Sequence, residues 1–80
     1  MGRERYEYQG PHSDIDLREV LFELQKIGNS VRVCAIDPRT NTEVVIVGSP
    51  AMSSYSLKIN AIRKLRYVIA KKQAAQALKR

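Results

Sequence analysis

Side chains that support catalysis are scarce in this chain of 80 residues, which contains one cysteine, Cys34, and one histidine, His12. Nucleophilic or acid–base catalysis needs such a group held beside a second group that activates it. His12 lies in a polar N-terminal stretch, and Cys34 lies in an apolar stretch with no candidate base close in sequence. We therefore expect a surface histidine, a half-buried unreactive cysteine and a protein that is not an enzyme.

Metal and cofactor sites also lack their usual residues. One cysteine and one histidine cannot supply the three or four ligands that a zinc ion takes. The carboxylates of Asp14, Asp16, Glu19 and Glu23 are scattered, which is typical of a solvated surface. The segment at residues 48–50, Gly-Ser-Pro, lacks the Gly-Lys-Ser/Thr that completes a phosphate-binding loop. We expect no metal and no cofactor.

The distribution of charge is the strongest chemical signal in the sequence. Residues 1–44 hold six basic and eight acidic residues and carry −2, whereas residues 45–80 hold eight basic residues and no acid and carry +8. A surface of one sign attracts partners of the opposite sign. The basic end of the chain is therefore a candidate surface for an anionic partner, nucleic acid included.

Two strands joined by a tight loop are predicted between Val31 and Val47. The loop at residues 38–41 begins with a proline, which fixes φ, and ends with an asparagine, which accepts the left-handed region. This hairpin is the scaffold against which the remaining elements are placed.

The preceding stretch, residues 13–27, is compatible with a helix or a strand. Its apolar residues recur at helical spacing between a possible cap, Ser13, and a possible end, Gly28. The same residues also alternate, and Gly28-Asn29 suits a two-residue hairpin turn of type II′. The turn chemistry favours a strand over residues 19–27. The alternative is a helix there, in the order α-β-β-α.

The two turns together set the register of three antiparallel strands. They place Ile27 opposite Ser30 and Asp37 opposite Thr42. One face of the resulting sheet is then entirely apolar, and it collects Phe22, Leu24, Val31, Val33, Ala35, Val44 and Ile46. Two independently chosen turns that produce one continuous apolar face favour a three-stranded meander.

The opposite face of this sheet mixes polar and apolar side chains. It carries Glu23, Gln25, Arg32 and Glu43 but also Cys34 and four larger apolar residues, Leu21, Ile36, Val45 and Val47. Those four residues form the candidate association face, because such a surface is too apolar to be left in water. We expect a homo-oligomer, with a dimer favoured, an exposed strand edge and exchange of strands between copies as a further possibility.

A basic amphipathic helix is predicted from about Tyr55 to Lys72 or beyond, capped by Ser53 or Ser54. Its apolar stripe should cover the apolar sheet face. Its outward side forms the candidate nucleic-acid face, which consists of Arg63, Lys64, Tyr67 and Lys71. Three further basic residues lie near the edges of this side: Lys58, Arg66 and Lys72. Residues 73–80 have little to bury, so a basic, fraying extension is expected.

The segments IGNSVRVCAIDPRTNTEVVIVGSP (residues 27–50) and AIRKLRYVIAKK (residues 61–72) carry a resemblance to a known family. They resemble short bacterial proteins of unknown function in which IGNSVxVxAIDPxTxTEVxIVG precedes a basic C-terminal helix. The likeness covers roughly residues 20–72 and implies a strand for residues 19–27. Asn41 stands where that family usually has glycine. The resemblance implies no activity and no catalytic residue.

The sequence as a whole predicts an α+β fold with one C-terminal helix packed on a three-stranded antiparallel meander. Residues 1–13 are expected to be a mobile arm, with an edge strand near Arg5 to Tyr8 as the alternative, and residues 14–72 form one domain. No apolar run approaches about 20 residues, and the charged start is unlike a signal peptide. We expect a cytoplasmic protein that associates with itself or with another protein, or alternatively binds nucleic acid.

Overall fold

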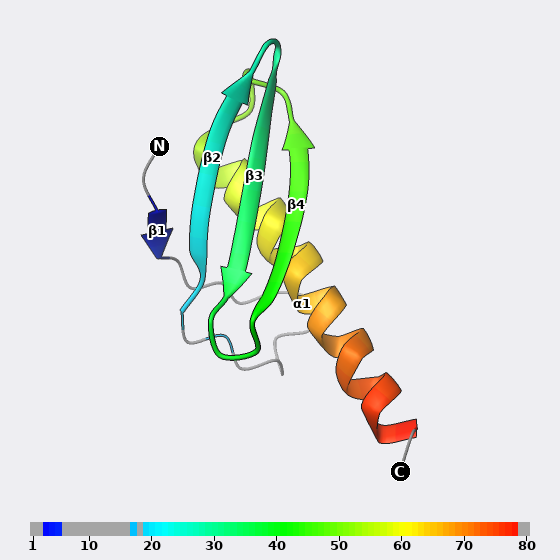
Figure 1. Cartoon of the computed structure of the whole chain (residues 1–80). Coiled ribbons are helices and arrows are strands. Elements are labelled where there is room, and N and C mark those ends of the chain that lie inside the picture. The colour runs from blue at the N-terminus through cyan, green and yellow to red at the C-terminus, as the bar shows by residue number, and fades with distance from the viewer. Residues whose placement is uncertain (1–2, 6–16, 18, 79–80) are drawn as a thin grey trace.

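A sheet of four antiparallel strands with one long helix on one of its faces forms the fold (Figure 1). The computed structural model describes residues 3–5, 17 and 19–78. The elements are β1 (Arg3–Arg5), β2 (Leu21–Ile27), β3 (Ser30–Asp37), β4 (Thr42–Gly48) and α1 (Ser54–Leu78), and the strand order is β1-β2-β3-β4. The predicted α+β fold, a meander followed by a C-terminal helix, is confirmed. The α-β-β-α alternative is wrong because β2 is a strand.

The two turns have the backbone geometry that their residues favour. Gly28 has a φ of 57°, as the first position of a type II′ turn requires, and Ile27 pairs with Ser30. Asn41 has a φ of 55°, in the left-handed region that asparagine tolerates better than most residues. Asp37 pairs with Thr42 across the second loop. Local turn chemistry therefore fixes how the three long strands are aligned.

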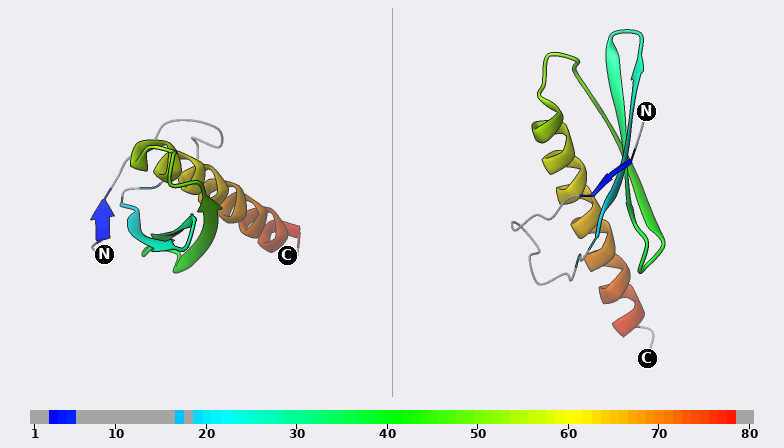
Figure 2. Two further views of the ribbon diagram at one scale, coloured as in Figure 1. Left: turned by 90° about the horizontal axis from the view of Figure 1, so that it is seen from above. Right: turned by 90° about the vertical axis from the view of Figure 1, so that its left-hand side faces the viewer.

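The observed register places the apolar side chains as the sequence predicts. Phe22 lies opposite Ala35, which lies opposite Val44, while Val33 lies between Leu24 and Ile46. Side chains of this face pack against α1 and form a core of Phe22, Val33, Ala35, Val44, Leu57, Ala61, Ile62, Leu65 and Ile69, joined by Leu17 and Val20. Figure 2 shows α1 lying along this one side of the sheet.

The connection from β4 to α1 brings the start of the helix very close to the sheet. A Cβ atom on Gly48 would collide with the Cδ2 atom of Leu57, so any larger residue at this position would have to displace the Leu57 side chain. Ser53 caps the helix, because its Oγ accepts a hydrogen bond from the backbone N–H of Ser56 at 3.1 Å. The helix thus begins where the predicted cap stands.

Regular secondary structure extends to both ends of the described part of the chain. Of the N-terminal arm expected at residues 1–13, the structure describes only Arg3–Arg5, which form the edge strand β1 paired with Leu21 to Glu23. The rest of the alternative edge strand near Arg5 to Tyr8 lies outside the described residues. At the other end α1 continues beyond Lys72 to Leu78. Within the described part of the chain, no helix is both long and apolar enough to span a membrane.

Candidate association face and basic helix surface

The sheet face turned away from α1 holds the four residues of the candidate association face. The register pairs Leu21 with Ile36 and Cys34 with Val45, so their side chains form one band across β2, β3 and β4. Leu21, Ile36 and Val45 are partly buried, and Val47 is 68% exposed. None of the described elements covers this band, since α1 lies on the other side (Figure 2). The structure thus brings all four predicted residues together.

Cys34 lies within this band and is more buried than the sequence suggests, with 2% of its surface exposed. Its thiol donates a hydrogen bond to the Glu43 carboxylate. Burial raises the pKa of the Cys34 thiol from 9.0 to about 11, and the hydrogen bond and the negative charge of Glu43 add to the increase. The thiol is therefore protonated at neutral pH and is a poor nucleophile.

Charges of both signs surround the apolar band. Arg32 lies opposite Gln25 on one side and Val47 on the other, while Glu43 lies opposite Ile36. Glu23 lies opposite Cys34, and the next residue pair on the same face of the sheet contains Arg32. A face with an apolar centre and both signs of charge can be complementary to a second copy of itself.

One backbone group at the open edge of β4 is bound by a side chain of the helix. The Lys64 ammonium reaches the sheet and donates a hydrogen bond to the Val45 carbonyl at 2.9 Å. Charged lysine side chains at an edge strand oppose pairing with another chain. The exposed strand edge predicted as part of the association surface is therefore partly occupied, and the sheet face is the better candidate.

The candidate nucleic-acid face is only partly formed as predicted. Arg63, Lys64, Tyr67 and Lys71 are all exposed on α1. Arg63, Tyr67 and Lys71 follow one another at four-residue spacing and share one side of the helix. The Lys71 ammonium lies 5.3 Å from the centroid of the Tyr67 ring. Lys64 is directed at the β4 edge instead, so the continuous row contains three residues, not four.

Two of the flanking cations lie in the protein interior. Arg66 is 2% exposed and Lys58 is 7% exposed, although the helical pattern places both near the edge of the basic side. The Lys58 ammonium lies 5.8 Å from the centroid of the Phe22 ring. Long aliphatic stems let such side chains lie along an apolar surface. These two charges therefore do not enlarge the basic surface.

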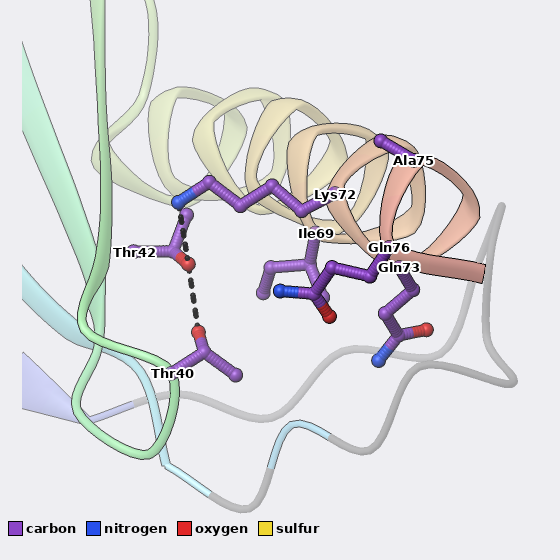
Figure 3. A pocket seen from close by; sticks show the side chains of 7 residues that line it. All are labelled: Thr40, Thr42, Ile69, Lys72, Gln73, Ala75 and Gln76. Atoms are coloured by element: carbon purple, nitrogen blue, oxygen red, sulfur yellow. Dashed lines mark hydrogen bonds between the residues drawn. The ribbon is translucent and has the colours of Figure 1, made fainter. Parts of the chain in front are cut away.

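A pocket that the sequence did not indicate lies between the β3–β4 loop and the C-terminal half of α1 (Figure 3). It is lined by Thr40, Thr42, Ile69, Lys72, Gln73, Ala75 and Gln76. No sequence motif indicates this pocket. Its residues come from distant parts of the chain, and they meet because α1 packs beside the β3–β4 loop. Among the described residues, no three His, Cys, Asp or Glu side chains gather as they would around a metal ion. His12 lies outside those residues.

Comparison with known proteins identifies a family but no activity. No curated protein and no solved structure matches the chain significantly. Residues 17–72 match DUF6898, a domain of unknown function. The match includes β2, β3, β4 and most of α1, and therefore both candidate surfaces. Because it covers more than half of the sequence, the chain belongs to the DUF6898 family.

Proposed function

We propose that this protein is a small non-enzymatic module that forms a homodimer by packing the sheet faces of two copies against each other. The observation that carries this proposal is the apolar band of Leu21, Ile36, Val45 and Val47, which no described element covers. A domain of this size buries a smaller fraction of its surface than a large domain does, so it gains stability by covering a second apolar face. Cys34, the only thiol, is protonated and buried, which supports a role without catalysis.

A second copy of the chain fits this face electrostatically. The net charge of +6 would oppose pairing if the basic helices met. In a dimer packed sheet to sheet, each helix lies on the outer side of its sheet. With layers about 10 Å apart, the two helices would be separated by roughly 30 Å. That distance exceeds the Debye length of about 8 Å at physiological ionic strength, so the repulsion between helices is screened.

The expected dimer is small and of moderate affinity. Strands β2, β3 and β4 contain 7, 8 and 7 residues. Strand spacing and rise per residue give these strands a planar footprint of roughly 350 Å². Standard protein interfaces bury about 800 Å² of accessible surface on each partner. We therefore expect a dissociation constant in the micromolar range.

Substitution of Val47 tests where the copies meet. Val47→Lys places a charge on the exposed end of the apolar band and should weaken dimerisation at least tenfold in sedimentation velocity experiments. Leu78→Lys is the matched control, because Leu78 is also an exposed apolar residue but lies at the end of α1. Equal dimerisation of the native protein and both variants would show that the copies do not meet through this face.

The second candidate function is nucleic-acid binding through the row of Arg63, Tyr67 and Lys71. It is favoured by the eight basic residues and no acid after Val44. A basic row with an aromatic residue can contact phosphates and stack on a base. Fluorescence anisotropy with single-stranded and duplex DNA at low salt tests this function.

Charge reversal at the row should have a larger effect than charge reversal elsewhere. Arg63→Glu with Lys71→Glu should abolish binding, while Lys26→Glu, an exposed charge on β2, should change affinity by less than threefold. Absence of binding by the native protein at low salt would rule out this candidate.

A further inference from the structure

The pocket beside the C-terminal half of α1 combines one cation with neutral polar and apolar groups. Its volume is about 500 Å³, within the range of small-molecule sites. Thr40 and Thr42 face it from the β3–β4 loop and the start of β4 (Figure 3). Ile69, Lys72, Gln73, Ala75 and Gln76 face it from α1. The pocket lies on the helix side of the sheet, away from the association face.

A chain of hydrogen bonds holds the lysine of this pocket in place. The Lys72 ammonium donates to Thr42 Oγ1 at 3.3 Å, the two threonine Oγ1 atoms lie 2.8 Å apart, and Thr40 donates to Asp37 Oδ2 at 2.8 Å. Since Thr40 gives its proton to Asp37, Thr42 donates to Thr40. An ammonium has three N–H donors, so two remain for a ligand after the bond to Thr42.

Among the described residues that line the pocket, Lys72 is the one with a charged side chain. None of the seven lining residues is acidic. The nearest carboxylate in this chain of hydrogen bonds, Asp37, is 1% exposed. Its two oxygens accept hydrogen bonds from the backbone N–H of Arg39 and from Thr40. Asp37 thus fixes the loop and is buried, whereas the Lys72 side chain is exposed.

We propose that this pocket binds a small organic oxyanion, a carboxylate or a phosphate monoester on a compact apolar body. The oxyanion would accept hydrogen bonds from Lys72 and from the carboxamides of Gln73 and Gln76. The apolar body would rest on Ile69 and Ala75. A few polar groups around an apolar floor are typical of sites that orient one small ligand.

Titration of the full chain followed by amide chemical shifts tests the site. The probes are phenyl phosphate, benzoate and inorganic phosphate, each added at constant ionic strength. Phenyl phosphate and benzoate should shift the amides of residues 40–42 and 69–76, and phenyl phosphate should bind at least fivefold more tightly than inorganic phosphate. An absence of shifts in this region at 20 mM phenyl phosphate (roughly the limit of a useful affinity) would overturn the proposal.

Adjacent lysines provide a matched pair of variants. Lys72→Gln should weaken phenyl phosphate binding at least tenfold, while Lys71→Gln, which removes the same charge outside the pocket, should change it less than twofold. Equal losses from the two variants would indicate only general attraction to a basic helix.

Ala75→Phe fills the pocket at an exposed helix position and keeps the charge, so it should also abolish binding. Retained binding in Ala75→Phe would overturn the proposal even if Lys72→Gln proved unstable.

Discussion

At the scale of single residues, Cys34 shows how environment decides the chemistry of a side chain. The sequence predicts an unreactive cysteine because no base lies near it. The structure supplies a stronger reason, since the thiol is buried and donates to the Glu43 carboxylate. Both features favour the neutral thiol over the thiolate. Cys34 therefore acts as a packed, hydrogen-bonded residue of the candidate association face.

The raised pKa of Cys34 predicts a loss of stability at high pH. The folded thiol has a pKa of about 11 against an ordinary value of 9.0, so the unfolded chain loses this proton first as the pH rises. The stabilisation is complete below pH 9 and is lost between pH 9 and 11, by about 2 kcal/mol. Urea unfolding at pH 8 and pH 10.5 should show this loss in the native protein. The same pH dependence in Cys34→Ala would contradict the assignment to Cys34.

At the scale of elements, the meander could be predicted because its turns obey local rules. Gly28 and Asn41 take positive φ, and the register between them follows from counting residues. The pocket could not be predicted, because it depends on how far α1 extends past the sheet. The burial of Lys58 and Arg66 could not be predicted either. Helical periodicity gives the direction in which a side chain points, but it does not show whether the long aliphatic stem lies along an apolar surface.

Close packing between β4 and α1 predicts an energetic coupling between Gly48 and Leu57. Gly48→Ala should displace the Leu57 side chain and lower the free energy of unfolding by about 1–3 kcal/mol. In the Leu57→Ala background the added methyl group has space, so the same substitution should cost much less. A double-mutant cycle by chemical denaturation measures the coupling. Additive effects would mean that the two residues do not compete for the same space.

At the scale of the whole molecule, the protein has two sides with different properties. On one side of the sheet, α1 completes the core and carries a basic surface and a polar pocket. On the other side, an apolar band with mixed charges lies across β2, β3 and β4. Pairing through this band would produce four layers, with the two sheets inside and the two basic helices outside. Both helices and both pockets would then stay accessible in the dimer.

Intermolecular nuclear Overhauser effects in a mixed sample of isotope-labelled and unlabelled protein test this arrangement most directly. The methyl groups of Ile36, Val45 and Val47 in one copy should show contacts with the same groups in the other copy. These contacts should disappear on dilution below the dissociation constant. A sample that stays monomeric at about 200 μM, well above the expected micromolar constant, or contacts confined to α1 or to the β4 edge, would contradict the proposed dimer.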